Sequence, residues 1–212
     1  MKTDAHAHTQ LDADFGSGSP SSQYIGFTTT VPTPTAAGTE PSTFGYARIA
    51  VVNNSTNFPA AASRQKKLAT AVETIVATGG NIGKIYGLNF WDASTAGARK
   101  RFALLADAFG FLATAIAAGD LVTLPGHNLV VSDEVLVRAI PGSTLPAALT
   151  DWAKYFVKTV SGNDITLSAT DGGSTIDLAA AGSFFVQRLR PKTWDEGDKL
   201  TFAANEIVFI EG

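Results

Sequence analysis

Short runs of β-branched and aromatic residues, separated by turn-forming residues, follow one another along the chain from Tyr24 onwards. The turn-forming residues include Gly79-Gly80 and Asp171-Gly-Gly173, which tolerate the positive φ that many tight turns require. They recur about every ten residues, a spacing typical of β-sandwiches, jelly rolls and barrels. We therefore expect an all-β fold, jelly-roll or sandwich-like, with strands at Tyr24–Thr29, Tyr46–Asn53, Thr70–Ala77, Ile82–Trp91, Val130–Ala139, Tyr155–Val160, Asp164–Ser168, Ser183–Arg190 and Lys199–Glu211.

Two stretches fit more than one kind of secondary structure. Arg64–Ala77 begins with apolar residues at helical spacing, but its second half is rich in Thr and Val, so we expect a helical start and an extended end. Phe102–Ala118 is rich in Ala and Leu and fits a buried helix or a strand. Asp107 and Gly110 interrupt this most apolar stretch, so we expect no membrane span.

The composition excludes several classes of protein. The chain has 212 residues, 45% of them apolar and 17% charged, which is enough apolar material for a buried core. A formal net charge of −3 lacks the positive surplus needed to neutralise phosphates, so we expect no nucleic-acid partner. The absence of cysteine excludes disulfides, thiolate metal sites and thiol catalysis. Met1–Leu11 lacks the apolar core of a secretory signal.

Residues 1–23 are small and polar almost throughout and end in a stretch rich in Gly, Ser and Pro. They offer too little apolar surface to offset the entropy lost when their backbone becomes ordered. We therefore predict an extended N-terminal arm that becomes ordered against a neighbouring subunit and stays outside the core of its own chain.

Few residues have the character of catalytic or metal-binding groups. The arm contains five side chains that can ligate metals: Asp4, His6, His8, Asp12 and Asp14. Because the flanking residues predict no rigid surroundings for such a site, we expect a solvated polar segment. His127 is expected at a turn, where its ring bonds to the backbone. No nucleophile elbow, phosphate-binding loop or zinc-protease motif is present. We expect no catalytic residue, no metal, no cofactor and no enzymatic activity.

A family resemblance begins at Tyr24–Thr33 and continues through Gly38-Thr-Glu40 and Gly45-Tyr-Ala-Arg48. These segments resemble the opening of a widespread group of tailed-bacteriophage virion proteins. Further matching segments follow in order: Ala77–Gly80, Ile82–Ala93, Ala118–Asp120 and Glu196–Ala204. Members are tail-fibre-like or capsid-decoration-like structural proteins, and the resemblance favours a strand in the first half of Phe102–Ala118.

Arg48 lies in one of the resembling segments and is expected on a strand. Tyr46, Arg48 and Ala50 would then share one face, opposite Ala47, Ile49 and Val51. We expect Arg48 to point outward or to cap a neighbouring carboxylate, in a structural role.

A second resemblance covers Leu121–Arg190. This stretch resembles a small β module of phage tail and virion proteins, and carries its elements in order: Gly126–Leu129, Ser132–Arg138, Thr144–Leu149, Trp152–Val160 and Thr166–Gly173. Asn128 and Ser132 replace residues that are usually Gly in the module, which affects the expected turns more than the fold.

Together the two resemblances predict one β domain interrupted by another. We expect an arm at 1–23, an outer β domain at 24–119 plus 191–212, and an inserted β domain at 120–190. Insertion at a surface loop costs little, because the entropy of loop closure grows only with the logarithm of loop length.

The predicted function is that of a non-enzymatic structural protein of a tailed-phage virion, assembled in the host bacterial cytoplasm. The first hypothesis is decoration or cementing of the capsid shell; the alternative is a tail-fibre or baseplate component that contacts a receptor or glycan. The expected partners are the major capsid protein or other virion subunits, and we expect a homo-oligomer. Two basic segments are the candidate partner-binding residues: Arg64, Lys66, Lys67, Arg99, Lys100 and Arg101.

Overall fold

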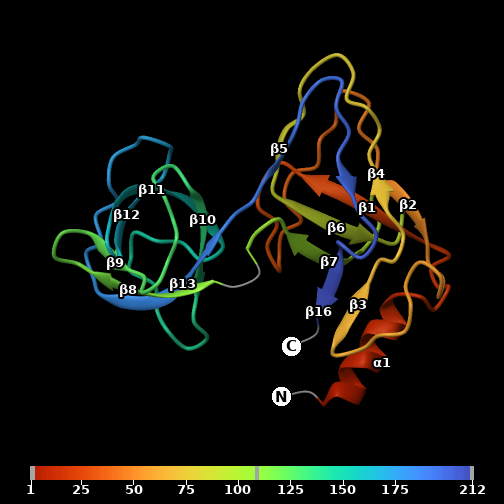
Figure 1. Ribbon diagram of the computed structural model, residues 1–212, viewed down its shortest axis with the longest axis horizontal. Coiled ribbons are helices and arrows are strands. Elements are labelled where there is room, and N and C mark those ends of the chain that lie inside the picture. The colour runs from red at the N-terminus through yellow and green to blue at the C-terminus, as the bar shows by residue number, and fades with distance from the viewer. Residues whose placement is uncertain (1–2, 108–109, 211–212) are drawn as a thin grey trace. The chain divides into compact units, whose positions relative to one another are not determined.

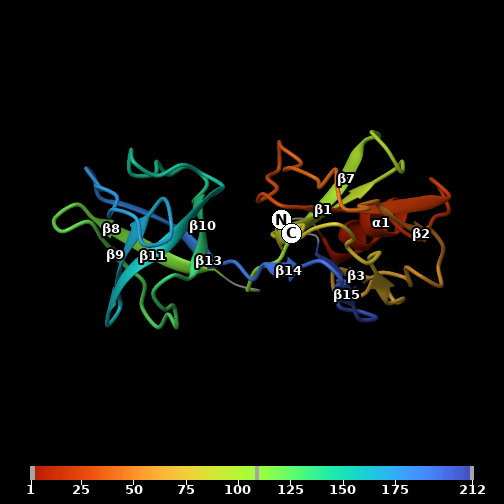
Figure 2. The same ribbon diagram turned by 90° about the horizontal axis from the view of Figure 1, so that it is seen from above.

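The computed structural model describes residues 3–107 and 110–210, which form one helix and sixteen strands (Figures 1 and 2). The predicted all-β class is confirmed. The chain divides into two compact units, unit 1 (Met1–Leu104 with Lys192–Gly212) and unit 2 (Leu105–Pro191). No helix among the described residues is long and apolar enough to span a membrane.

Unit 1 is centred on a four-stranded antiparallel sheet with the order β2-β1-β6-β7. Its strands are β1 (Ser22–Thr28), β2 (Ile49–Val52), β6 (Gly87–Trp91) and β7 (Arg99–Leu104). Ile25 lies opposite Phe90 and Phe27 opposite Leu88, and all four side chains are buried. Because alternate residues of a strand share a face, these pairs define the side of the sheet that faces the core.

The C-terminal segment returns to unit 1 and runs antiparallel to residues 65–85. Three two-stranded sheets result: β14 (Lys192–Trp194) with β5 (Gly83–Ile85), β15 (Thr201–Phe202) with β4 (Val72–Glu73), and β16 (Val208–Ile210) with β3 (Gln65–Lys67). Figure 1 shows the blue β16 beside the orange β3. The return strands complete unit 1, because they supply the buried rings of Trp194, Phe202 and Phe209.

Unit 2 is a closed antiparallel barrel with the order β10-β11-β12-β9-β8-β13 (Figure 2). Its strands are β8 (Phe111–Ile116), β9 (Leu121–Thr123), β10 (Glu134–Ala139), β11 (Ala153–Ser161), β12 (Asp164–Ser168) and β13 (Gly182–Arg188). Alternate side chains point inward, among them Ala113, Val137 and Phe184, and belong to one buried cluster. Closure leaves the six strands without a free edge.

The N-terminal arm was wrongly predicted as extended and outside the core. Asp4–Asp14 form α1, and Thr3 caps it by accepting a hydrogen bond from the His6 backbone N–H at 3.3 Å. Ala7, Leu11 and Phe15 are fully buried, with Phe15 stacked on Phe209 at 4.1 Å between ring centres. Three apolar residues at a spacing of four are enough to anchor one face of a helix when a matching core exists.

The two ambiguous stretches contain no helix in their described residues. Phe102–Ala118 falls across the junction between the units, ending β7 and forming β8, while residues 108 and 109 lie outside the described part of the chain. The helical start expected at Arg64 is also wrong, because Ser63 and Arg64 have φ of 49° and 58° and form a turn that leads into β3.

The first junction of unit 2 lies before β8, at Leu105, rather than at residue 120. β8 pairs with β13 and with β9, so it is an integral strand of the barrel. That each unit folds by itself stays a proposal.

Candidate functional site

Glu40 and Arg48, from two of the phage-like segments, form a bidentate ion pair in unit 1. The Arg48 Nε and Nη2 atoms each lie 3.0 Å from a carboxylate oxygen of Glu40. Arg48 Nη1 donates to the carbonyls of Ala93 and Ala96, and its guanidinium lies 4.0 Å from the centre of the Trp91 ring. These hydrogen bonds confirm the predicted capping of a neighbouring carboxylate, and only 9% of the Arg48 side chain is exposed. Arg48 lies just before β2 and not on the strand expected for it.

Tyr46 connects this ion pair to the central sheet. Its hydroxyl donates to Glu40 at 3.0 Å and accepts from the Phe27 backbone N–H at 2.9 Å. Burial raises the pKa of the Tyr46 hydroxyl above its ordinary value, so the hydroxyl keeps the proton that it donates. A side chain on Gly26 would collide with the Glu40 carboxylate, since a Cβ there would lie 2.7 Å from Oε1. Glu40, Tyr46 and Arg48 are therefore hydrogen-bonded to one another and have a structural role.

Both basic segments contact α1. Lys66 Nζ lies 2.6 Å from Asp12 Oδ1, and the Lys66 side chain is 2% exposed. Arg101 donates to Asp14 at 2.6 Å, and Arg64 lies 3.3 Å from Asp4. Three of the six candidate partner-binding residues therefore bind the chain's own helix; their role in binding another subunit stays a prediction.

The acidic residues of α1 thus hold the helix in place and do not converge on a metal. Partial burial opposes the ionisation of Asp12, but hydrogen bonds from Lys66 and the Ala61 backbone outweigh it and lower the pKa of this carboxyl. His8 Nε2 accepts from the Arg64 backbone N–H at 2.9 Å. In the described parts of the chain, no three His, Asp or Glu side chains are grouped as a metal site would require.

Arg99 and Lys100 line a second basic region, a pocket of about 320 Å³ next to Pro34 and Phe102. Arg99 donates to the carbonyls of Pro34 and Ala36, and burial lowers its pKa. Lys100 lies 3.2 Å from Asp92. The pKa of Asp92 is below its ordinary value because the Ala98 backbone N–H and Lys100 both donate to it. Lys100 is therefore paired with a carboxylate, and Arg99 is hydrogen-bonded to two backbone carbonyls of the chain.

His127 lies in the loop before β10, as expected. Its Nδ1 accepts from the Leu129 backbone N–H at 3.1 Å. The buried Arg188 of β13 also contacts this loop: it donates to the Asn128 carbonyl and forms an ion pair with Asp133 at 2.5 Å. This hydrogen bonding gives the loop a structural role.

One outer face of the barrel combines exposed apolar side chains with an absence of charge. It runs over β13, β8 and β9, where Phe185 lies opposite Leu112 and Ile116 opposite Leu121. Leu112 is 58% exposed and Phe185 37%. Its outward side chains on these three strands carry no charge: Leu112, Thr114, Ile116, Leu121, Thr123, Ser183, Phe185 and Gln187. Charged side chains flank it on the next strands, Arg138 opposite Phe185 and Asp164 opposite Thr123. We call it the β8–β13 face; the alternation of Phe111–Ile116 could have revealed it once that segment was taken as a strand.

The comparisons with known proteins give one finding. Residues 4–132 match the family described as podophage GP4 fiber I protein gp80. The match runs from α1 through the central sheet of unit 1 and ends after β9 of the barrel. Neither the curated proteins nor the solved structures contain a match to the chain.

Proposed function

The chain belongs to the podophage GP4 fiber I protein gp80 family and is a structural protein of a phage virion, and we propose that it is a component of a tail fibre. The observation that carries this proposal is that the matched family is described as a fiber protein, over residues that run from α1 into the barrel. It supports the tail-fibre alternative over capsid decoration. The resemblance seen in the sequence does not distinguish these two hypotheses.

The structure of unit 1 supports a role in binding and assembly. Its most buried ionic groups, at Arg48 and Lys66, are neutralised inside the chain and are not arranged around a reacting group. Such internal pairs fix the positions of the segments that they join, which suits a component of a fibre.

Location in the virion is the direct test. We would label purified virions with gold-conjugated antibody against the chain and measure its copy number by quantitative mass spectrometry. The proposal expects gold at the tail and a few tens of copies or fewer. Gold spread over the shell, with a copy number near that of the major capsid protein, would contradict it and return capsid decoration as the better hypothesis.

The β8–β13 face supports self-association as part of this function. Exposed apolar surface without charge is typical of the centre of an interface between proteins. We propose a second copy of this chain as its partner, because two such apolar centres can meet while the flanking charges of Arg138 and Asp164 stay at the rim of the contact.

Sedimentation velocity tests this proposal. Replacing Leu112 and Phe185 together with Ser should shift the full-length protein towards monomer, with the barrel intact because both side chains point outward. Val160→Ser, a matched change of an exposed apolar residue in the β11–β12 hairpin, should leave association unchanged. A wild-type protein that stays monomeric at all concentrations would overturn the proposal.

A further inference from the structure

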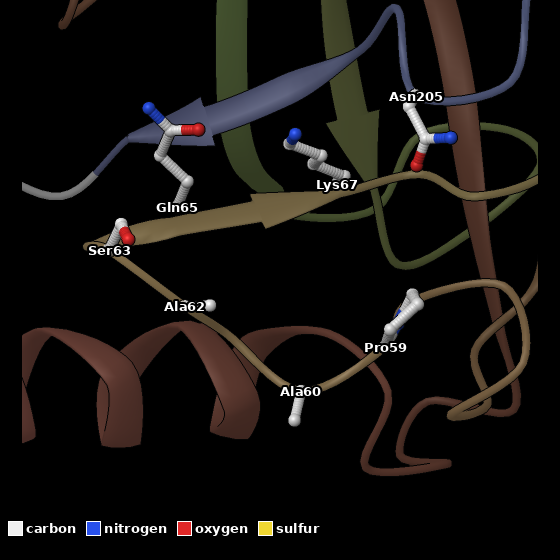
Figure 3. A pocket seen from close by; sticks show the side chains of 7 residues that line it. All are labelled: Pro59, Ala60, Ala62, Ser63, Gln65, Lys67 and Asn205. Atoms are coloured by element: carbon white, nitrogen blue, oxygen red, sulfur yellow. The ribbon is translucent and has the colours of Figure 1, made fainter.

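A pocket in unit 1 combines small apolar walls with polar side chains that form no hydrogen bond within the described part of the chain. It has a volume of about 310 Å³ and is lined by Pro59, Ala60, Ala62, Ser63, Gln65, Lys67 and Asn205 (Figure 3). We call it the β3 pocket. Small-molecule sites occupy roughly 300–1,000 Å³, so its size suits a ligand no larger than a single sugar residue.

The pocket has a rigid frame. β3 is hydrogen-bonded to β16, and Figure 3 shows residues 59–63 running between this ladder and α1. Ala61 N–H donates to Asp12 Oδ1 at 2.9 Å, and Arg64 N–H donates to His8 at 2.9 Å. These two hydrogen bonds tie the loop to α1, one just before the turn and one within it.

The turn at this end of the pocket is conformationally unusual. Ala62 and Gln65 exchange two backbone hydrogen bonds of 2.9 Å, and Ser63 and Arg64 between them both have positive φ. Two-residue hairpin turns with positive φ normally contain Asn or Gly, so Ser-Arg is strained there. Strain of this kind persists where the surroundings impose it, and such sites are often ligand sites.

The polar side chains of the pocket are accessible from solvent, Ser63, Lys67 and Asn205 being exposed, and they differ from their neighbours in forming no hydrogen bond with the described residues. Nearby Asp12, Lys66, Asn57 and His8 all form hydrogen bonds. The side chains of Ser63, Gln65, Lys67 and Asn205 form none with any residue in 3–107 or 110–210. Gln65 and Lys67 extend from the same face of β3, as their spacing of two dictates.

The donor set defines the chemistry of a ligand. Lys67 supplies one positive charge, and the pocket is lined by no carboxylate. The amides of Gln65 and Asn205 and the hydroxyl of Ser63 can each donate and accept, which matches sugar hydroxyl groups. Pro59 and Ala62 offer short apolar contacts to a sugar C–H face, and no aromatic ring is present for stacking a base. We propose that the β3 pocket binds a uronic acid, a sugar that carries one carboxylate.

This inference goes beyond the fibre function. The pocket lies within unit 1 and does not depend on where the chain sits in the virion, so failure to bind the sugar would leave the fibre proposal untouched.

The probe is sodium glucuronate, titrated into the full-length protein and followed by amide chemical shifts. Binding should be saturable, with the largest shifts at residues 59–67 and 205. Lys67→Gln should weaken it at least about tenfold, the loss expected for a hydrogen bond to a charged group. Asn205→Asp, which keeps the side-chain shape and tolerates the positive φ of 65° at this position, should weaken it similarly by repelling the carboxylate.

Three controls separate the sugar site from simple attraction of an anion. Glucose should bind more weakly than glucuronate because it lacks the charge, and acetate because it lacks the hydroxyls. Lys100→Gln, in the second basic pocket, should leave glucuronate binding unchanged. Shifts equal for acetate and glucuronate, shifts centred elsewhere, or wild-type affinity in Lys67→Gln would each overturn the proposal.

Discussion

At the scale of single residues, unit 1 depends on buried cations that each have a dedicated carboxylate. Arg48 is paired with Glu40, and Lys66 with Asp12, and neither cation can reach water without local opening. A buried pair of this kind contributes little net stability compared with an apolar pair, but removing one partner leaves an uncompensated charge. Substitution of either carboxylate, Glu40 or Asp12, is therefore expected to lower the stability of unit 1.

Glu40→Gln should lower the free energy of unfolding by about 3 kcal/mol, because Arg48 would remain buried without a counter-charge. Urea unfolding followed by tryptophan fluorescence measures the change. Lys199→Gln is the matched control: its pair with Glu73 is half exposed, so we expect a change below about 1 kcal/mol. A Glu40→Gln protein as stable as the control would show that Arg48 is solvated.

Asp12 should make stability depend on pH. Its pKa is lower in the folded protein than in the unfolded chain, so its contribution is present above the ordinary Asp pKa, near 3.9. That contribution is lost as the pH falls through the lower, folded pKa. Melting temperatures between pH 7 and pH 2 should therefore fall more steeply for wild type than for Asp12→Asn.

The control for this titration is Asp195→Asn, since the Asp195 side chain is exposed and its carboxylate accepts no hydrogen bond from the described residues. It should follow the wild-type curve. Parallel curves for wild type and Asp12→Asn would rule out Asp12 as the titrating group.

At the scale of elements, α1 is part of the core of unit 1 and not an appendage. Leu11 and Phe15 are fully buried, and Phe15 lies among the rings of Phe58, Phe90 and Phe209. Gly16 follows with φ of 89°, where a Cβ would lie 2.7 Å from the Phe58 carbonyl oxygen. Glycine at this position lets the chain leave the helix close against the core.

Leu11→Ala should reduce the free energy of unfolding by about 2–5 kcal/mol, the usual cost of a cavity at a fully buried leucine. Thermal and urea unfolding of the full-length protein measure it. His6→Ala, on the exposed side of the same helix, should be nearly neutral. If Leu11→Ala is also neutral, α1 does not pack as described and the sequence-based arm becomes the better description.

At the scale of the whole molecule, the barrel has a core of its own. The buried cluster that contains Leu124, Val137 and Phe184 draws all its members from unit 2. β8 closes this barrel by pairing with both β13 and β9, so a fragment that starts after β8 would expose the edges of both strands.

Residues 105–191 expressed alone should therefore fold cooperatively, with a β-type circular dichroism spectrum and dispersed amide resonances. Residues 121–190, the boundaries suggested by sequence resemblance, should be unstable or aggregate because β8 is missing. Equal stability of the two fragments would show that β8 is dispensable for the barrel.

The sequence by itself determined the β class and the position of most strands, because alternation and turn residues act over a few neighbouring positions. It also indicated that Arg48 caps a neighbouring carboxylate, although Arg48 lies just before β2 and not on the strand expected for it. Tertiary structure alone decided that residues 4–14 form a helix, because Ala7, Leu11 and Phe15 become an apolar anchor only against rings contributed by the distant Phe58 and Phe209. It also decided that the basic segments contact α1 and that Lys67 and Asn205 line one pocket. The reason is that the C-terminal segment pairs with residues far away in the chain, and no local pattern encodes such a pairing.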